Sequence, residues 1–316
     1  MKKNSLIFVA GEGTMEGKAI IRLLQKRNYN KVINLKQPEP DLTDHGMVKE
    51  YFEETRPQYV FLFAGKSGGI KANQEIPATL MLDNLQIISN VISLAHEYKI
   101  EKLLYLASSC IYPKHAEQPM RPDMLMTGPL EPTNSAYATV KLAGIEFCRA
   151  YQREHGNNFI SAIPANIYGP EDNFNEGNSH VVAALMRRMH EAKLNGDREV
   201  KIWGTGKPRR EFIYVDDLAD ACLFLMKLYN EEEPLNIGSG TTLSISDLVT
   251  VIMEVTEYRG NLRYDDSMPD GMPEKMLDCT PLFSLGWKPS IIFELGAKIT
   301  YDWFKLNCGP TSLRKN

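Results

Sequence analysis

The segment Leu6-Ile-Phe-Val-Ala-Gly-Glu-Gly-Thr-Met-Glu-Gly17 decides the fold of this chain. Its first five residues are continuously apolar, as expected of a buried strand. A glycine-rich loop follows at once, and a helix is predicted from Met15. A strand, a glycine loop and a helix in this order are typical of a dinucleotide-binding unit. The glycines permit a tight turn and allow a pyrophosphate to approach backbone N–H groups at the helix N-terminus.

The spacing of these glycines, G-x-G-x-x-x-G, differs from the usual G-x-G-x-x-G fingerprint. A purely structural turn between strand and helix is therefore the alternative to a cofactor loop. The position of the loop, between the first strand and the first helix, favours cofactor binding. The loop residues that we assign to the cofactor are Gly11, Gly13, Thr14, Met15 and Gly17.

Strands and helices alternate over the first half of the chain. Continuous apolar strands are predicted at 6–10, 31–35, 59–63, 102–107 and 159–164, with amphipathic helices between them. This pattern predicts an α/β fold, a Rossmann-type doubly wound parallel sheet with helices on both faces. Beyond residue 170 the elements are shorter and predict a smaller C-terminal α/β substrate lobe. We therefore expect domains at 1–170 and 171–316, with some later segments returning to the first.

Composition excludes several classes of protein. The chain has 316 residues, is 43% hydrophobic and 24% charged, and carries a net charge of −4, so no global basic field favours nucleic acid or a membrane surface. No apolar run approaches the roughly 18–20 residues that span a bilayer. The N-terminus is expected to be a first strand rather than a signal peptide. Five cysteines without CxxC or CxxH spacing predict neither a metal site nor disulfides, and a reduced cytoplasmic location is expected.

A candidate proton donor follows the fourth predicted strand. Tyr137 and Lys141 lie four residues apart, so they share one face of a helix. An ammonium beside a phenol favours the phenolate and lowers a pKa that is ordinarily about 10. Such a tyrosine exchanges a proton with a carbonyl or alcohol oxygen near neutral pH. Ser108, at the end of the strand predicted at 102–107, offers a hydroxyl to the same oxygen.

Further motifs lie between residues 108 and 217, within a similarity that runs from about residue 5 to 306. They are Ser108-Ser-Cys-Ile-Tyr-Pro-Lys114, Leu130-Glu-Pro-Thr-Asn134, Tyr137-x3-Lys141-x2-Gly144, Asn166-x-Tyr-Gly-Pro170, Asp172-Asn-Phe174, Asn178-Ser-His-Val181, Trp203-Gly-x-Gly206, Arg210-Glu-Phe212 and Val215-Asp-Asp217. Two of them, Ser108-Ser-Cys-Ile-Tyr-Pro113 and Asn178-Ser-His180, are specific to one branch of such enzymes. By these motifs the chain resembles the extended short-chain dehydrogenase/reductases and, within that superfamily, the GDP-L-fucose synthases.

The resemblance implies a reaction in two parts. The implied substrate is GDP-4-keto-6-deoxy-D-mannose, whose C4 carbonyl acidifies the protons on C3 and C5. Epimerisation at these carbons needs an acid and a base, and Cys110 and His180 match the pair that the family uses. Ser108 and Tyr137 match the donors that stabilise the enolate oxygen. Reduction then takes a hydride from the nicotinamide to C4, with Tyr137 as proton donor and Lys141 tuning it.

The resemblance also implies binding residues and an assembly. Positions that match the family's cofactor contacts are Lys141, Pro164, Asn166, Ile167 and His180, and positions that match its GDP contacts are Arg188, Trp203, Arg210 and Asp278. No metal is implied. Members of the superfamily dimerise through two helices of the cofactor domain, which predicts a homodimer here through the helices at 78–98 and 136–154.

The cofactor is the point at which the chain departs from the family. NADP is implied, but Gly13 replaces an arginine of the glycine loop that pairs with the 2′-phosphate, and Glu12 stands beside it. Lys36, near the end of the second predicted strand, is the one cation predicted to meet that phosphate. We therefore expect NADP with a weak preference, and NAD as the alternative.

Two alternative functions remain at the level of the sequence. One is an epimerase/reductase, or a reductase alone, acting on a related GDP-4-keto sugar such as a 3,6-dideoxyhexose or a 6-deoxyheptose. The other is a non-catalytic NAD(P)-binding regulator. Regulators of this superfamily usually lose the tyrosine or the lysine, and both Tyr137 and Lys141 are present here.

Overall fold

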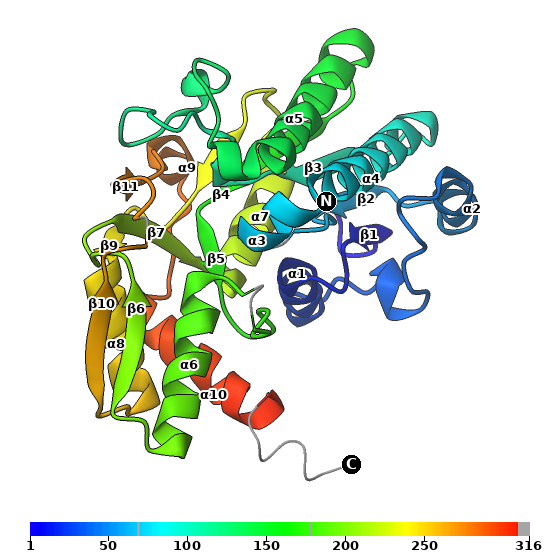
Figure 1. Ribbon diagram of the computed structural model, residues 1–316. Coiled ribbons are helices and arrows are strands. Elements are labelled where there is room, and N and C mark those ends of the chain that lie inside the picture. Colours follow the sequence, from blue (N-terminus) through cyan, green and yellow to red (C-terminus); the bar gives the residue numbers. More distant parts are fainter. Residues whose placement is uncertain (68–69, 177–178, 269, 309–316) are drawn as a thin grey trace.

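A parallel sheet forms the centre of the larger domain in the computed structural model, which describes residues 1–67, 70–176, 179–268 and 270–308 (Figure 1). The strand order is β1-β2-β3-β4-β8. The strands are β1 (Ile7–Ala10), β2 (Tyr59–Leu62), β3 (Lys102–Leu106), β4 (Phe159–Pro164) and β8 (Leu235–Ile237). Every residue of β1 to β4 is buried, because helices cover both faces. The predicted Rossmann-type α/β fold is confirmed.

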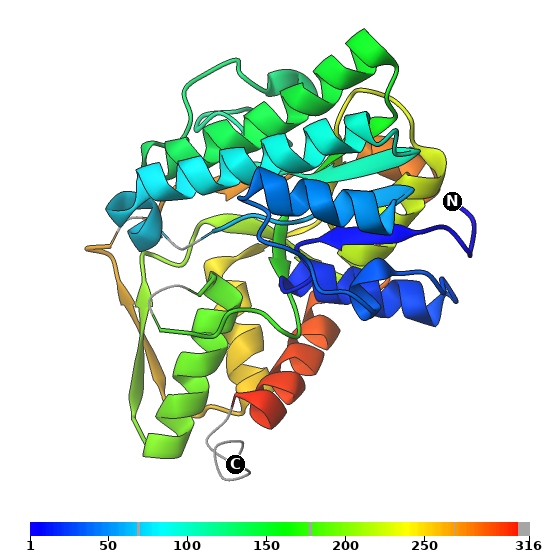
Figure 2. The same ribbon diagram turned by 90° about the vertical axis from the view of Figure 1, so that its right-hand side faces the viewer.

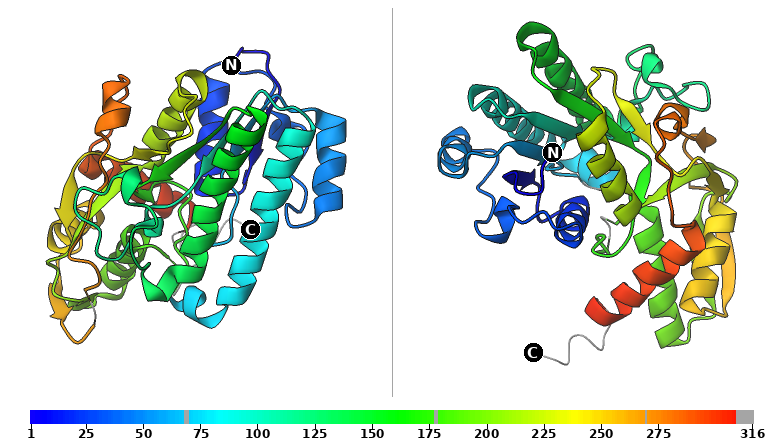
Figure 3. Two further views of the ribbon diagram at one scale, coloured as in Figure 1. Left: turned by 90° about the horizontal axis from the view of Figure 1, so that it is seen from above. Right: turned by 180° about the vertical axis from the view of Figure 1, so that it is seen from behind.

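Two layers of helices enclose this sheet. Figures 2 and 3 show three helices side by side on one face, and contacts link α4 with both of its neighbours. These helices are α2 (His45–Thr55), α4 (Pro77–Glu97) and α5 (Ser135–His155), with the short α3 (Ile70–Glu75) before α4. The other face is covered by α1 (Met15–Lys26) and α7 (Val215–Leu228), which pack against each other. Strand β8, which follows α7 in the chain, also belongs to the larger sheet. The chain therefore returns to the first domain after residue 171.

The second predicted strand, at 31–35, is wrong. Only Val32 pairs with β1, through an isolated bridge to Ile7, and Ile33–Leu35 forms a 3-10 helix, η1. The cause is the side chain of Asn34, whose Oδ1 accepts from the Val9 backbone N–H and whose Nδ2 donates to the Val9 carbonyl. Because this amide satisfies the edge of β1, the main chain is free to turn away.

The smaller lobe contains two short sheets with its own core. One sheet has the order β11-β7-β5 with β9 paired to β7, and the other pairs β10 with β6. The strands are β5 (Asn166–Tyr168), β6 (Glu199–Trp203), β7 (Arg209–Tyr214), β9 (Thr242–Ser244), β10 (Asn261–Asp265) and β11 (Glu274–Lys275). The helices are α6 (Val181–Asn195), α8 (Ile245–Thr256), α9 (Thr280–Ser284) and α10 (Phe293–Asn307). The second core lies among α6, α8, α10 and their strands, as Figure 1 shows.

Helix α4 is long and apolar enough to cross a membrane by composition alone. Half of its most apolar window is buried inside the protein, where Ile88, Val91 and Ile92 cover the sheet. Leu82 and Leu85, in contrast, are exposed at 57% and 36%. Thus α4 carries more apolar surface than the sheet requires.

The order of the strands defines where a ligand binds. From β1 the chain moves outward to Val32, and it then returns to the opposite side of β1 to form β2. This reversal is a topological switch point, and ligands of open α/β sheets bind beyond the carboxyl ends of the strands at such a point. The glycine loop after β1 lies there, and so do the residues that follow β2, β3 and β4.

Candidate active site

The glycine loop is shaped for close approach of backbone to backbone. Gly11 has a φ of 102°, and a Cβ on it would lie 2.5 Å from the Ala64 nitrogen. A Cβ on Gly17 would lie 2.0 Å from the Gly11 carbonyl oxygen, so neither position accepts a side chain. A Cβ on Gly13 meets nothing within 4 Å and faces open space. The loop therefore fits a dinucleotide pyrophosphate, which needs a bare backbone at this point.

Thr14 and Met15 begin the helix that faces this loop. Thr14 is the N-cap of α1, where its Oγ1 accepts from the Gly17 N–H at 3.0 Å and donates to the Gly11 carbonyl at 2.8 Å. Met15 is the first residue of α1. The capped N-terminus directs its first-turn N–H groups towards the loop, as a phosphate site requires.

Gly144 brings the proton donor to the sheet. A Cβ on Gly144 would lie 2.3 Å from the ring of Tyr105 in β3, so only glycine lets α5 approach this closely. This approach explains why the motif contains a glycine three residues after Lys141. It places Tyr137 and Lys141 beside the carboxyl end of β3, where 3-10 helix η2 (Ser109–Ile111) also contacts α5.

The phenol of Tyr137 does not have the lowered pKa that was predicted. Burial raises the pKa of Tyr137 well above the ordinary value, and the neighbouring charges of Cys110 and Glu16 raise it further. Lys141 Nζ lies 5.9 Å from the centre of the Tyr137 ring and donates instead to the Leu106 carbonyl at 3.0 Å. Tyr137 is consequently a neutral phenol near pH 7, the protonation state that a proton donor needs.

Lys141 is buried and has a perturbed charge. Burial lowers the pKa of Lys141 to about 8, although the charges of Cys110 and Glu16 act in the opposite direction. Its Nζ lies near Gly65, where an added Cβ would approach it to 3.5 Å. The loop after β2 thus supplies one wall beside the lysine. Gly68, in the Gly-Gly-Ile segment of that loop, lies outside the described residues.

Ser108 and Cys110 lie at the end of β3, and both are half-buried. Ser108 is the N-cap of η2, and its Oγ accepts from the Cys110 N–H at 3.4 Å. Cys110 lies close enough to Tyr137, Lys141 and Lys275 for its charge to raise the pKa of each of them. The structure therefore brings together Ser108, Cys110, Tyr137 and Lys141, as the sequence predicted.

His180 is the N-cap residue of α6 and is open to solvent on one side. The surrounding protein partly desolvates it and lowers its pKa, with Lys275 lowering it further and Glu16 opposing both. An imidazole with a lowered pKa is neutral near pH 7 and able to accept a proton. Asn178, in the same predicted motif, lies outside the described residues.

Pro164, Asn166 and Ile167 link the two sheets. Pro164 ends β4 in the larger sheet, and Asn166 begins β5 in the smaller lobe. Asn166 Nδ2 donates to the Glu211 carbonyl at 2.7 Å, and Ile167 pairs with Ile213 of β7. These three predicted cofactor residues therefore stand at the carboxyl edge of the larger sheet, where the two domains join.

Asp270 connects Arg210 with the turn that follows Trp203. Trp203 ends β6 and is 64% exposed, and the Thr205 hydroxyl two residues later donates to Asp270 Oδ2 at 2.7 Å. Arg210 donates to the Asp270 carbonyl at 3.3 Å and to the Met272 carbonyl at 2.7 Å. An exposed indole and a guanidinium on two strands that follow each other in the chain suit a sugar nucleotide, because the guanidinium pairs with pyrophosphate.

The two other predicted substrate residues have clear local roles. Arg188 in α6 is half-buried and donates to the Lys201 carbonyl in β6, and burial lowers its pKa. Asp278 Oδ1 accepts from the Thr280 N–H at 2.9 Å, at the start of α9. No described contact joins Arg188 or Asp278 to Arg210, so their predicted contacts with GDP stay predictions.

Lys275 is a candidate residue that no sequence motif singled out. It lies in β11, in register with Arg210 of β7, and burial lowers its pKa. The charge of Lys275 lowers the pKa of His180, and the charge of Cys110 raises the pKa of Lys275. A lysine between the predicted base and Arg210 is well placed for a diphosphate. The only signal in the sequence is its position three residues before Asp278.

The opposite end of the cofactor loop is acidic. Glu39 Oε2 accepts from the Gly11 N–H at 2.6 Å and from the Glu12 N–H at 3.3 Å. Glu12 Oε1 in turn accepts from the Glu39 N–H at 3.2 Å, and its Oε2 accepts from Asn34 at 2.8 Å. Burial raises the pKa of Glu39, and the charge of Glu12 raises it as well. Lys36, the predicted phosphate partner, is exposed.

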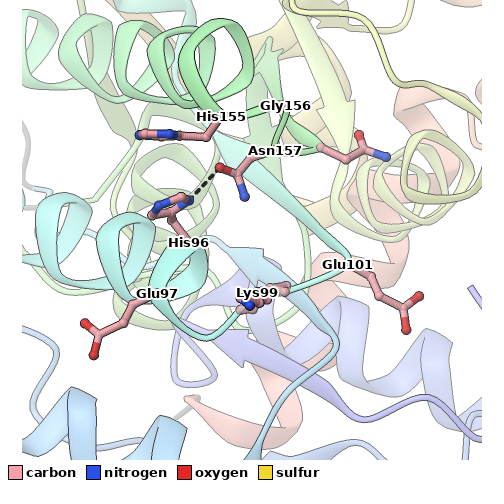
Figure 4. A pocket seen from close by; sticks show the side chains of 9 residues that line it. His96, Glu97, Lys99, Glu101, His155, Gly156 and Asn157 are labelled. Carbon is pink, nitrogen blue, oxygen red and sulfur yellow. Dashed lines mark hydrogen bonds between the residues drawn. The ribbon is translucent and has the colours of Figure 1, made fainter.

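A surface cavity of about 440 Å³ lies far from these residues. Figure 4 shows its lining at the C-terminal ends of α4 and α5, where His96 Nδ1 lies 2.8 Å from Asn157 Oδ1 and the His96 ring stacks on His155. Tyr137 stands at the opposite end of α5. The cavity is therefore not the catalytic site. Within the described ranges, no three His, Cys, Asp or Glu side chains group as metal ligands.

Comparison with known proteins agrees with this geometry. The NAD dependent epimerase/dehydratase family matches residues 7–238. GDP-L-fucose synthase 1 of Arabidopsis thaliana is 49% identical over 305 residues, which are 96% of this chain and 94% of that protein. A GDP-6-OMe-4-keto-L-xylo-heptose reductase from C. jejuni has a TM-score of 0.90 and 32% identity, with 97% of this chain and 99% of that chain covered. A GDP-L-fucose synthetase from Naegleria fowleri bound to NADP has a TM-score of 0.89 and 29% identity, with 97% and 96% covered.

Proposed function

Since the chain belongs to the NAD dependent epimerase/dehydratase family and, within it, to the group of the GDP-L-fucose synthases, we propose that it converts GDP-4-keto-6-deoxy-D-mannose to GDP-L-fucose. The reaction epimerises C3 and C5 and reduces C4. The protein is an NAD(P)-dependent enzyme of the extended short-chain dehydrogenase/reductase type.

One observation carries this proposal: the carboxyl end of β3 and the start of α5 bring together residues for both halves of the reaction. Tyr137 and Lys141 provide for reduction, and Cys110 stands close enough for its charge to act on both. A simple reductase needs no thiol at this point. The presence of Cys110 beside the tyrosine therefore favours a carbonyl substrate whose neighbouring carbons also exchange protons.

Epimerisation uses the acidity of the carbons beside the C4 carbonyl. In the proposed mechanism Cys110 removes a proton from one face as the thiolate, and His180 exchanges a proton at the other face. Negative charge develops on the C4 oxygen, where Ser108 and Tyr137 donate hydrogen bonds. Lys275 and Lys141 add positive charge to the same neighbourhood, which stabilises the developing enolate.

Reduction follows at the same oxygen. A nicotinamide held at this site would supply the hydride that C4 accepts. Tyr137, neutral near pH 7 because burial raises its pKa, gives its proton to the oxygen. Lys141, anchored on the Leu106 carbonyl, then compensates the negative charge left on the phenol. Gly11, Gly17 and the N-terminus of α1 would hold the dinucleotide diphosphate.

Product analysis tests the proposal directly. The enzyme is incubated with GDP-4-keto-6-deoxy-D-mannose and each reduced cofactor in D₂O, and the product is identified by NMR. We expect GDP-L-fucose with deuterium at C3 and C5. A reduced product that keeps the D-manno configuration and carries no deuterium would contradict the epimerase half of the function.

A second candidate is a reductase for a related GDP-4-keto sugar, because the heptose reductase from C. jejuni has nearly the same fold over the whole chain. The two candidates differ in their need for the acid–base pair. A GDP-4-keto-6-deoxyheptose offered in competition with the hexose would decide between them. We expect the hexose to have the higher kcat/KM.

We also propose that the enzyme is a homodimer. Leu82 and Leu85 of α4 and Phe147 of α5 are 57%, 36% and 38% exposed, and these helices pack side by side on the outside of the sheet. Ile88, Val91 and Ile92 of α4, in contrast, are buried in the protein's own core. The remaining apolar surface suits a four-helix interface between two copies.

A charged substitution tests the dimer. Leu82→Glu combined with Phe147→Glu should give a monomer by light scattering at micromolar concentration, because two carboxylates per subunit would be desolvated in the interface. Leu228→Glu, at an exposed leucine of α7 on the opposite face, is the control. A wild-type protein that is monomeric under these conditions would refute the dimer.

The five free thiols agree with a reducing cytoplasmic location, which we propose as well.

A further inference from the structure

The adenosine end of the cofactor site contains two linked carboxylates. Glu39 stands 22 positions after Gly17, and its Oε2 accepts two backbone N–H groups of the glycine loop. Within the described residues its second oxygen, Oε1, accepts no hydrogen bond. Glu12 is fixed by the Glu39 N–H and by Asn34, which is itself bonded to both backbone groups of Val9. The position of this pair is therefore determined by β1.

An acidic residue about 20 positions after the glycine loop binds the ribose of NAD in folds of this type, whereas an arginine accommodates the 2′-phosphate of NADP. A vicinal diol donates hydrogen bonds to a carboxylate, and a phosphate with up to two negative charges is repelled by it. Here two carboxylates stand together, and neither forms an ion pair with a lysine or arginine of the described chain.

The nearby cations are engaged elsewhere or exposed. Lys18 of α1 pairs with Glu171 at 2.6 Å, and Arg22 pairs with Glu171 and with Asp216. Lys36 is exposed at the end of η1 and has no ion pair among the described residues. A 2′-phosphate would thus meet two fixed negative charges and at most one flexible ammonium.

We propose that Glu39 binds the adenosine ribose of NADH and that Glu12 and Glu39 together disfavour the 2′-phosphate of NADPH, so that this enzyme binds NADH at least as tightly as NADPH. The inference rests on the proposed function only in requiring a nicotinamide dinucleotide. It separates this chain from the Naegleria fowleri relative, whose structure is bound to NADP.

Gly13 offers a way to reverse this preference. Its Cβ position is open, with no atom within 4 Å, and its backbone lies next to Glu12. The loop therefore accepts an arginine at residue 13 without displacing the tight contacts at Gly11 and Gly17. The guanidinium would pair with a 2′-phosphate by two parallel hydrogen bonds.

Isothermal titration calorimetry of the purified protein with NADH and with NADPH, without sugar, tests the proposal. For the wild type we expect a Kd for NADH equal to or below that for NADPH. The variant with Glu12→Gln and Gly13→Arg should gain at least about tenfold in NADPH affinity relative to NADH. Adenosine 2′,5′-bisphosphate and ADP, titrated in the same way, isolate the phosphate from the nicotinamide.

The control is Glu50→Gln in α2, which removes the same charge from an exposed position outside the cluster and should leave the ratio unchanged. Tighter binding of NADPH than of NADH by the wild type would overturn the inference, whatever the variants do. Failure of both dinucleotides to bind would instead contradict the proposed function. The two failures are therefore distinguishable.

Discussion

At the catalytic end of the site the reacting residues lie on one strand end and one helix, whereas at the adenosine end the polar residues come from three separate segments. Ser108 and Cys110 follow β3 directly, and Tyr137 and Lys141 share one face of α5. At the other end, Glu12 and Glu39 are brought together by Asn34, whose side chain replaces a strand pairing with Val9. The catalytic end is therefore local in sequence, and the adenosine end is a product of tertiary structure.

This difference implies that substitutions at the two ends have separable effects. Changes at the catalytic end should alter turnover with either cofactor by the same factor, because the hydride and the proton reach the same C4 carbonyl. Changes at the adenosine end should alter the ratio of cofactor affinities and leave the chemical steps nearly intact. A substitution at one end that changed both the turnover and the ratio of cofactor affinities would contradict this separation.

The largest expected effect is that of Tyr137→Phe. The variant should bind both dinucleotides like the wild type but lose about a hundredfold or more in turnover, because the C4 oxygen would have no proton donor. Steady-state kinetics with NADH and NADPH, together with calorimetry, measure this effect. If more than about a tenth of the turnover remained, Tyr137 would not be the acid.

Cys110→Ser should affect epimerisation more than reduction. A serine hydroxyl is a far weaker base than a thiolate at neutral pH, so deuterium incorporation at C3 and C5 should fall by about tenfold to a hundredfold. Some direct reduction of the unepimerised ketone should remain, which NMR of the product detects. Cys148→Ser, at a buried thiol in the same helix as Tyr137, is a control for the loss of sulfur. Unchanged exchange in Cys110→Ser would exclude this thiol as the base.

The catalytic end could be predicted from sequence because its spacing is fixed by one helical turn and one strand end. Tyr137, Lys141, Ser108 and Cys110 all lie where they were expected. Their protonation could not be predicted in the same way, because it depends on burial. The expected lowering of the Tyr137 pKa fails, since desolvation outweighs an ammonium that donates to Leu106 instead.

The adenosine end was less predictable for a related reason. A strand was expected at 31–35, and the amide of Asn34 that interrupts it has no signature in the local pattern. Glu39 follows Pro38 in a segment without periodicity, and only the folded loop shows that its carboxylate reaches Gly11. Lys36 was predicted as the phosphate partner because it was the nearest cation in sequence. Its side chain is exposed and forms no hydrogen bond or ion pair among the described residues.

The alkaline limb of the pH profile should report Lys141. Burial lowers its pKa to about 8, so the ammonium is present below that pH and is lost above it. We expect kcat/KM to fall by about fivefold between pH 8 and pH 9, because a group with this pKa goes from about half to about one tenth protonated, and the fall should be equal with NADH and NADPH. Lys141→Arg should retain partial activity and lose this limb, because a guanidinium stays protonated. An alkaline limb that persisted unchanged in Lys141→Arg would assign it to another group.

The smallest effect is expected from separating the two carboxylates. Among the described residues Glu39 Oε1 accepts no hydrogen bond, which leaves it for the ribose. Glu39→Gln should therefore weaken NADH binding about threefold, because an amide has one acceptor oxygen and that oxygen is already used by the Gly11 N–H. Glu12 is occupied on both oxygens, so Glu12→Gln should leave NADH binding within about twofold and act on NADPH through lost repulsion. Calorimetry of both variants with both cofactors gives four affinities. If Glu12→Gln instead weakened NADH more than Glu39→Gln did, Glu12 would be the residue that meets the ribose, and Glu39 would serve only to hold the loop.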